Sequence, residues 1–557
     1  MKTYTHKGFP FFLLALLISL LPFIYFFNKY AISLPYLDDF WAVYDFMWLA
    51  KRGYENERRL MPDYVFTSNL EHIIAYTKVS SLALYYLLRD KFSLIQLLII
   101  GNASWFLSIY VMAAAFYKKA KAPWLWLAFF PLIGISLQFS ENYFWGMASH
   151  QNFSVTFFVI VAFHCLTFIQ NQKLNFIVGI GFAIIAYLTS STGVIVFYVG
   201  TIILLIQRRY YSAGFFFLTS VTCSIILFIM SKVDDSVTID SSKVLNAFSF
   251  IGSISHLENS NILSIVYGIT ICLFFVYYVL QSNILKGKTL SNAELFFLSL
   301  ILFVVIVGII TGLKRPNVLL SRYKHYSAIA TLAVISLIYI RFYQTKKLAK
   351  STFMVVALTL AFVYNILTTV VYSYDIRKHY EYLVTDTYNW YVNDKLTAQF
   401  QAFCDNDYYR NILKDLKITF PKNNRIDFLI KNLRDTQQIE QSVEGLAIDT
   451  SYLVEKTVAG CYMKMLSVSS VLPDNLSHDE HCYLVLSSET KDFVFSFFPE
   501  RNDLPEIIAT KSIYGKTLTQ TVHLQYLPLG NYKLSVIRFK NQTPVKYINK
   551  KPILIKI

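Results

Sequence analysis

Two adjacent carboxylates, Asp38 and Asp39, stand just after the first long apolar run of the chain, residues 9–27. Neighbouring side chains point to opposite faces of a strand and lie about 100° apart around a helix, so one aspartate can face a reacting group while the other faces a partner. Such a carboxylate can take a proton from an attacking hydroxyl. The alternative interpretation is a pair of solvated loop acids near a helix start, where the helix dipole favours negative charge.

A cationic segment, KRPNVLLSRYKHY, begins at Lys314 and leads into a late apolar run. Arginine binds phosphate oxygens through two parallel hydrogen bonds and stays charged near lipid, so Arg322 is the preferred phosphate ligand and Lys314 the weakest candidate. Tyr323 could contact the substrate, and the remaining cations of the predicted phosphate site are Arg315 and Lys324. The alternative is that these side chains only extend to lipid headgroups.

Polar and aromatic residues of two further loops could bind the rest of a substrate. The stretch SENYFWGMASHQ, residues 140–151, mixes amides, a carboxylate and rings, and the segment EHII opens with an acid and a histidine. We predict substrate contacts from eight residues in all, which are Tyr323, Glu71, His72, Glu141, Asn142, Gln151, Trp41 and Trp145. The alternative is that the aromatic residues belong to the belt at the membrane interface.

The composition indicates a membrane protein. Of 557 residues, 55% are hydrophobic and only 15% are charged, whereas soluble domains have about 25% charged residues. The net charge of +16 is spread over short loops between apolar runs. We therefore interpret the basic residues as signals of topology and as contacts to anionic groups, and expect no nucleic acid as a partner.

Apolar runs predict about eleven transmembrane helices. With the N-terminus inside, the short cytoplasmic turns carry clusters of lysine and arginine, such as Lys118 to Lys121 and Arg208 with Arg209. Residues 71–89 are interrupted by Lys78 and two serines, so we expect an amphipathic helix on the outer interface there. The runs lie near residues 9–27, 93–117, 122–139, 152–170, 174–190, 192–207, 211–230, 261–281, 293–313, 325–343 and 352–373.

The chain divides into a transmembrane domain, residues 1–373 with an outer loop at 28–92, a helical linker at 374–444, and a final domain at 445–557. The final domain alternates apolar and polar residues in short runs broken by Gly, Pro, Asn and Asp, which predicts an antiparallel β-sandwich outside the cytoplasm. Whether Cys461 and Cys482 form a disulfide stays open.

Four short motifs in order resemble a known family. LDDFW, LEHII, ENYFWGMASHQ and SRYKHY are similar to segments of the polytopic bacterial glycosyltransferases of the GT-C fold, and among these to enzymes that modify O-antigen or other glycans of the lipopolysaccharide and cell envelope. The resemblance covers residues 1–373. Related sequences usually have Asn-Glu-His-Arg where this chain has Leu70-Glu71-His72-Ile73.

The resemblance implies transfer of a sugar from a polyprenyl-phosphate donor to a glycan hydroxyl at the periplasmic face of the bacterial inner membrane. Asp38 or Asp39 would be the acid of the first loop, and Arg322 would hold the phosphate. A flippase and a donor synthase would be partners, with the N-terminus cytoplasmic and the final domain periplasmic.

We expect a single displacement in which Asp38 acts as general base and Asp39 orients the base or the acceptor. The aspartates would meet the Ser-Arg-Tyr turn across a groove open to the outer leaflet. No metal is required, although Mg²⁺ or Mn²⁺ could bind the pair. Two rival functions are an O-antigen polymerase or ligase that uses undecaprenyl-diphosphate glycans, and a transporter of a lipid-linked sugar. The transporter would need charged residues near the midplane of its spans and repeated halves.

Overall fold

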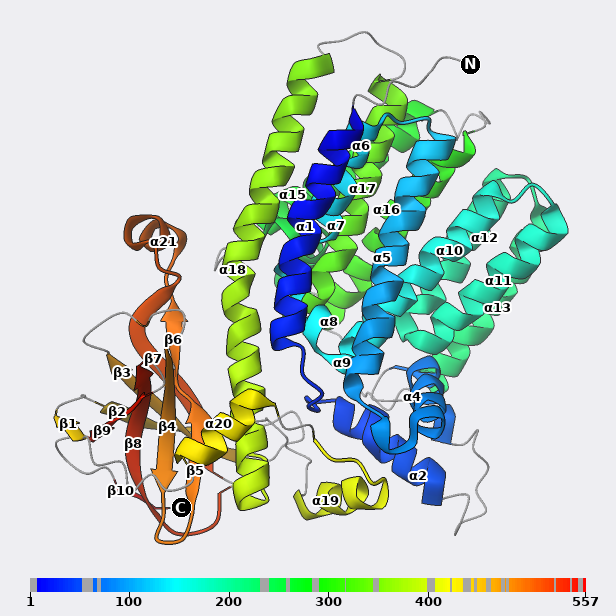
Figure 1. Cartoon of the computed structure of the whole chain (residues 1–557). Helices are drawn as coiled ribbons and strands as arrows, with labels where there is room; N and C mark the ends of the chain where they lie inside the picture. The colour runs from blue at the N-terminus through cyan, green and yellow to red at the C-terminus, as the bar shows by residue number, and fades with distance from the viewer. Residues whose placement is uncertain are drawn as a thin grey trace. The chain divides into compact units, whose positions relative to one another are not determined.

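The chain forms two compact units in a computed structural model (Figure 1). The first unit comprises Met1–Ala31 and Trp41–Tyr372, and the second comprises Ile32–Phe40 and Ser373–Ile557. The structure describes all residues except 1–7, 53–63, 68–71, 231–239, 257–260, 283–289, 316, 344–349, 398–405, 421–422, 434–441, 445–447, 457–461, 472–475, 477–479, 525–526, 541–542, 549–553 and 557.

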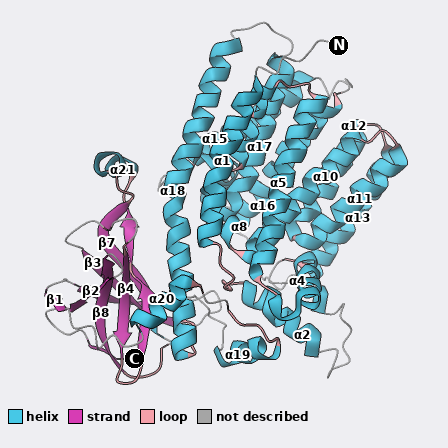
Figure 2. Cartoon of the chain, viewed as in Figure 1, coloured by secondary structure: helices cyan, strands magenta, loops and turns pink. Residues whose placement is uncertain are grey.

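The first unit is built of helices (Figure 2). The last of them, α18, continues into the second unit. Their bounds are α1 Phe9–Tyr30, α2 Phe46–Arg52, α4 Ala75–Leu88, α5 Leu94–Lys119, α6 Trp124–Leu127, α7 Phe129–Gly134, α8 Ser140–Phe144, α9 Gly146–Ala148, α10 Ser154–Phe168, α11 Gln172–Thr189, α12 Ile195–Ile206, α13 Tyr210–Met230, α14 Ser241–Ile251, α15 Ile262–Ser282, α16 Asn292–Lys314, α17 Lys324–Ile338 and α18 Lys350–Asn393.

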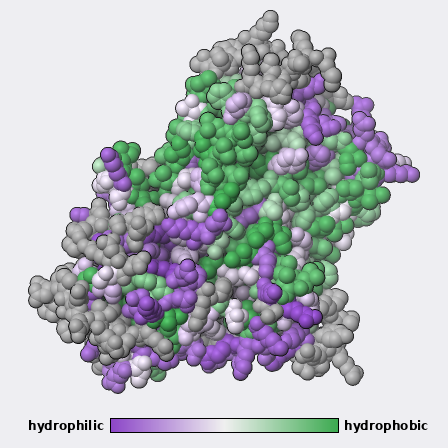
Figure 3. All heavy atoms as spheres, viewed as in Figure 1, coloured by the Kyte–Doolittle hydropathy of each residue, from purple (hydrophilic) through white to green (hydrophobic). Residues whose placement is uncertain are grey.

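Among the described residues, ten helical stretches are long and apolar enough to cross a membrane. Many large side chains that face outward from them are apolar, and hydrophobic residues cover much of the visible bundle surface (Figure 3), as expected for contact with lipid. The protein is therefore a multi-pass membrane protein. The ten stretches are Phe9–Tyr30, Leu94–Lys119, Trp124–Phe144, Gly146–Phe168, Gln172–Thr189, Tyr210–Met230, Ile262–Ser282, Asn292–Lys314, Ser321–Tyr343 and Met354–Asn393.

The predicted span at residues 192–207 corresponds to a shorter apolar helical stretch, Ser191–Ile206, which is not among the ten long ones. Helix α12 forms 12 residues of this stretch, and the 3₁₀ turn Ser191–Val194 forms the rest. The segment predicted as an interfacial helix contains α4, which has 14 residues and is likewise not among the long apolar helices. The short helix α14 was not predicted.

The span Trp124–Phe144 is broken rather than continuous. Helix α7 ends at Gly134, and the backbone leaves helical geometry at Ile135. Asn365 of α18 donates to the carbonyls of Leu132 (2.9 Å) and Ile135 (3.2 Å), and the indole of Trp105 donates to the carbonyl of Gly134 (2.8 Å). Neighbouring helices thus supply the hydrogen bonds that the break removes, which makes an irregular backbone tolerable at this depth.

The basic turns gather at one end of the helix bundle. Lys119 lies 5.4 Å from the ring of Phe168, so the ends of α5 and α10 meet. Arg209 donates to the carbonyl of Gln172 (2.9 Å), and Tyr339 donates to the carbonyl of Lys121 (3.1 Å). Helices α8 and α9 lie at the opposite end (Figure 1).

The second unit contains two β-sheets. One has the order β1-β9-β8-β4-β5, with β10 also paired to β8, and the other has the order β2-β3-β7-β6. The elements are β1 Ser442–Glu444, β2 Ile448–Lys456, β3 Tyr462–Val471, β4 His481–Ser487, β5 Asp492–Ser496, β6 Phe498–Arg501, β7 Tyr514–His523, β8 Asn531–Lys540, β9 Thr543–Ile548 and β10 Leu554–Lys556, with helices α19 Asn406–Asp415, α20 Asn424–Leu433 and α21 Leu504–Thr510.

One apolar core joins the two sheets. Val468, Leu518 and Val522 from one sheet cluster with Leu484 and Phe495 from the other. Nearly all strand pairs are antiparallel as predicted, but β1 pairs with β9 in parallel. Because β1 follows the helical segment and not a hairpin, no tight turn forces it to be antiparallel. Cys482 is buried in this core, whereas Cys461 lies outside the described residues.

The C-terminal half of α18 packs on the β-sheets through buried polar contacts. Glu381 accepts hydrogen bonds from His481 Nδ1 (2.8 Å) and from the hydroxyl of Tyr483 (2.9 Å). Arg377 donates to the hydroxyl of Tyr514 and to the carbonyl of Glu480, each at 2.8 Å. The region predicted as a linker from residue 374 therefore begins inside a continuous helix that ends at Asn393.

Candidate functional site

The twin aspartates differ in their surroundings within the second unit. Asp39 is fully buried, and its Oδ2 accepts the backbone N–H of Tyr36 at 2.9 Å. Its own N–H donates to the carbonyl of Tyr36 (3.0 Å), and Leu37 between them has a φ of 43°. A non-glycine residue in the left-handed region is strained, and such strain clusters at functional sites. Asp38 is only half-buried, so it is the more accessible carboxylate.

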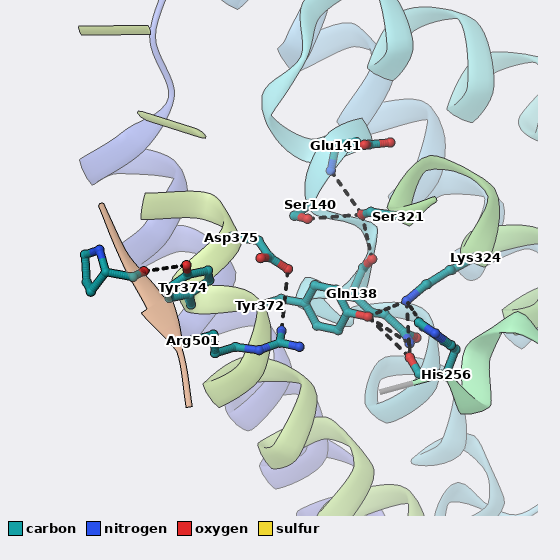
Figure 4. Close-up of polar contacts among 11 residues, drawn as sticks. Gln138, Ser140, Glu141, His256, Ser321, Lys324, Tyr372, Tyr374, Asp375 and Arg501 are labelled. Carbon is teal, nitrogen blue, oxygen red and sulfur yellow. Dashed lines mark hydrogen bonds and ion pairs between the residues drawn. The ribbon is translucent and has the colours of Figure 1, made fainter. Parts of the chain in front are cut away.

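The Ser-Arg-Tyr turn is fixed to the loop at residues 138–142 within the first unit (Figure 4). The hydroxyl of Ser321 donates to the carbonyl of Gln138 (2.7 Å), lies 3.0 Å from the hydroxyl of Ser140, and accepts the N–H of Glu141 (3.1 Å). These contacts join segments about 180 residues apart in the chain. They place the short 3₁₀ turn Ser321–Tyr323 against α8.

Arg322 lies between a carboxylate and two aromatic rings. Glu141 Oε2 accepts the backbone N–H of Arg322 (3.2 Å) and is 4.0 Å from its Nε. The guanidinium lies 5.3 Å from the ring of Trp145 and 5.4 Å from that of Tyr323, distances at which a cation is attracted by the aromatic face. The side chain remains 24% exposed. Four residues predicted separately, Arg322, Glu141, Trp145 and Tyr323, are therefore brought together.

A buried amide network supports this cluster from behind. Asn142 donates from Nδ2 to the carbonyl of Arg322 (2.9 Å) and to Nδ1 of His325 (3.2 Å), and its Oδ1 accepts from Asn152 (2.9 Å). Nε2 of His325 lies 3.1 Å from the hydroxyl of Thr156, which donates to the carbonyl of Asn152 (2.9 Å). Since Nδ1 accepts, the network assigns the proton of the neutral ring to Nε2.

Lys324, predicted as a phosphate ligand, is buried among protein groups. Its Nζ donates to the hydroxyl of Tyr372 and to the carbonyl of His256 (3.2 Å), which also accepts from Gln138 (2.7 Å). Figure 4 shows Lys324 between Tyr372 and His256. The ammonium thus ties α17, α18 and the segment after α14 together. Lys314 and Arg315 stand at the end of α16.

Of the remaining predicted residues, His72 and Gln151 contact the turn at Ser190 and Ser191. Nδ1 of His72 is 2.5 Å from the hydroxyl of Ser191, and Gln151 donates to the hydroxyl of Ser190 at 3.4 Å. Trp41 is half-buried in a helical turn, Phe40–Asp45. Glu71 lies outside the described residues.

Three polar residues of the site, Gln138, Asn152 and Thr156, escaped the sequence analysis because no motif marks them. Among the residues that the structure describes, no three His, Cys, Asp or Glu side chains converge as ligands of a metal ion.

An apolar cavity of about 280 Å³ lies within the first unit. Its walls come from α6, α7, α15, α17 and α18 and include Trp126, Tyr267, Leu360 and Tyr364. The hydroxyl of Tyr364 donates to Oε1 of Gln138 at 2.8 Å, so this cavity reaches the polar network described above.

Comparison with protein-family models, with curated proteins and with solved structures found no match.

Proposed function

We propose that this chain is a membrane glycosyltransferase that moves a sugar from a polyprenyl-phosphate donor to a hydroxyl of an envelope glycan. The observation that supports this most strongly is the position of Arg322, held by Glu141 and by the rings of Trp145 and Tyr323 at the end of the bundle opposite the basic turns. A planar guanidinium beside aromatic rings suits a phosphate next to a sugar, because it can bind two phosphate oxygens while the rings contact the apolar faces of the sugar.

The distribution of basic residues between the two ends of the helix bundle supports a topology for the protein. Lysine and arginine are enriched in cytoplasmic turns, so the end with Lys119, Lys121 and Arg209 would be cytoplasmic. The Arg322 cluster would then face the periplasm of a bacterial inner membrane. The apolar cavity lined by Leu360 and Tyr364 would receive part of the isoprenoid chain of the donor.

The proposed reaction is a single displacement. Asp38 takes the proton of the acceptor hydroxyl, whose oxygen forms a bond to the anomeric carbon. The bond from that carbon to the phosphate oxygen breaks, and the polyprenyl phosphate leaves with the bonding electrons while Arg322 binds its charge. Asp39 positions this step, because its buried carboxylate holds the Tyr36 turn that presents Asp38.

Two aspartate variants test this assignment in membranes supplied with donor and acceptor. We expect Asp38→Asn to lower the transfer rate by about 10²–10⁴-fold, the contribution of a general base. Asp39→Asn should lose much less, because an amide oxygen can still accept the Tyr36 N–H. Asp449→Asn, an exposed change on β2, is the control. Full activity of Asp38→Asn would refute the mechanism.

Arg322→Gln tests the phosphate ligand, and we expect a loss of about 10²–10³-fold, as for removal of a donor to a developing anion. Arg208→Gln is its control, since Arg208 is exposed at the basic end.

Comparing the glycans of a deletion strain with those of its parent would identify donor and acceptor. A missing branch would show which sugar is transferred and to which glycan it is attached.

A further inference from the structure

The turn between α12 and α13 carries two adjacent arginines at the basic end of the helix bundle. Arg208 has a φ of 59°. The N–H groups of Arg208 and Arg209 donate to the carbonyls of Leu205 (2.9 Å) and Leu204 (2.8 Å), respectively. This is the hydrogen-bond pattern of a helix end whose left-handed residue is usually glycine. Arginine at that position is strained, and strained residues cluster where the chain has a function.

A buried asparagine fixes the position of Arg209. The guanidinium donates from Nη1 to Oδ1 of Asn175 (2.8 Å) and from Nη2 to the carbonyl of Gln172 (2.9 Å), both in α11. Asn175 is 3% exposed, and its amide donates to the carbonyls of Leu166 (2.9 Å) and Ile169 (3.0 Å) near the end of α10. Three helices thus hold this cation in one place, whereas an arginine that only extends toward lipid headgroups would be unconstrained.

The held guanidinium is able to bind an anion. It has five N–H donors, and the two contacts with α11 use one donor of each terminal nitrogen. Arg209 is half-buried, whereas Arg208 and Lys173, which lies in the first turn of α11, are exposed. No acidic residue occurs between Glu141 and Asp234. The three cations at the start of α11 and α13 therefore have no acidic neighbour from α10 to α13, and this end of the two helices is complementary to a negative charge.

Apolar side chains close to these cations face outward from the bundle. Helices α11 and α13 lie at the edge of the bundle (Figure 1), and the rings of Phe176 and Phe215 meet between them at 5.5 Å. An apolar surface within two turns of clustered cations matches a phospholipid, which has an anionic phosphate above acyl chains. The apolar residues that are more than half exposed here are Leu174, Ile177, Tyr210, Tyr211 and Phe215.

We propose that the starts of α11 and α13 form a binding site for an anionic phospholipid. Arg209 and Lys173 bind its phosphate, and its acyl chains lie against the outer faces of the two helices. Phosphatidylglycerol is preferred over phosphatidylcholine, because the choline cation is repelled by three positive side chains. The site is at the basic end of the bundle, opposite the end with α8 and Arg322, so it is separate from the proposed donor site.

Native mass spectrometry of the full chain in detergent measures the affinity of the first bound lipid. The protein is titrated with phosphatidylglycerol or with phosphatidylcholine of identical acyl chains, and we expect several-fold tighter binding of phosphatidylglycerol. Arg209→Gln should lose most of this preference. Arg341→Gln is the matched control and should keep it, because Arg341 is another arginine of the basic end that donates to a carbonyl of a neighbouring helix, that of Gln281 (3.0 Å).

Arg209→Lys distinguishes a built site from general attraction to a charged surface. Lysine keeps the charge, but it is a single point charge that cannot hold two groups of α11 and bind two phosphate oxygens as well. We therefore expect this variant to lose most of the preference for phosphatidylglycerol. If the preference in Arg209→Lys or Arg209→Gln equals that of the wild type, the proposal fails.

A photoreactive lipid locates the site. Phosphatidylglycerol with a diazirine in one acyl chain is crosslinked to the full chain in nanodiscs, and mass spectrometry maps the modified peptides. We expect adducts in the first two turns of α11 and α13, several-fold fewer in Arg209→Gln, and no displacement by excess inorganic phosphate, which has no acyl chains to bury. Equal affinity of the wild type for the two lipids, adducts distributed evenly over the helices, or displacement by inorganic phosphate would each overturn the proposal.

Discussion

Asn142 is the buried side chain whose removal should most directly loosen the packing that positions Arg322. It is fully buried and joins the loop at residues 138–142 to the start of α17 through the carbonyl of Arg322 and the ring of His325. It also accepts a hydrogen bond from Asn152. Replacing it with alanine removes all three hydrogen bonds while changing nothing on the exposed surface.

The expected cost follows from those contacts. A hydrogen bond in a protein contributes about 1 kcal/mol net, and a buried group left without a partner costs about 1–3 kcal/mol. Asn142→Ala should therefore lower the free energy of unfolding by about 3 kcal/mol. Asn142→Asp should cost at least as much, because a carboxylate can still accept from Asn152 but cannot donate to the Arg322 carbonyl or to His325.

Reversible unfolding of the purified protein in mixed micelles, followed by intrinsic fluorescence, measures this free energy. Asn317→Ala is the control, because Asn317 is exposed in the segment just before the same turn and should cost no more than about 0.5 kcal/mol. If Asn142→Ala costs no more than this control, the amide does not hold the two segments together and our account of how Arg322 is positioned fails.

Two further predictions concern buried charged residues. Burial lowers the pKa of Lys78 to about 8, so the unfolded chain binds more protons than the folded protein between pH 8 and about 10.5, and the free energy of unfolding rises with pH. In unfolding titrations over that window, the wild type should gain about 3 kcal/mol relative to Lys78→Met. A difference between the two proteins that does not change with pH would contradict the lowered pKa of Lys78. Glu381→Gln removes the buried charge that receives hydrogen bonds from His481 and Tyr483. It should lower the free energy of unfolding by about 3 kcal/mol, detected as faster proteolysis of the β-sheets. Unchanged protease resistance would show that the contact between Glu381 and His481 contributes little to stability.

The sequence predicted the helical spans and the β-strands through local periodicity. Uninterrupted apolar runs can satisfy their backbone only as helices in lipid, and ten of the eleven predicted runs coincide with long helices. The run at residues 192–207 coincides with a shorter apolar helical stretch, Ser191–Ile206, whose first turn is a 3₁₀ helix.

The meeting of the candidate residues was decided by packing. No periodicity relates Ser321 to Gln138, and no local pattern distinguishes the buried Lys324 from the partly exposed Arg322, although they stand two positions apart.

By itself, the sequence determined that this is a multi-pass membrane protein with a β-stranded C-terminal region, because hydropathy and alternation are properties of neighbouring residues. The tertiary structure alone decided that Asp39 is buried beneath a strained turn, that Asn365 donates hydrogen bonds to the backbone of a broken span, and that Glu141 contacts Arg322. Those contacts join residues distant in the chain, and their formation depends on how whole helices pack.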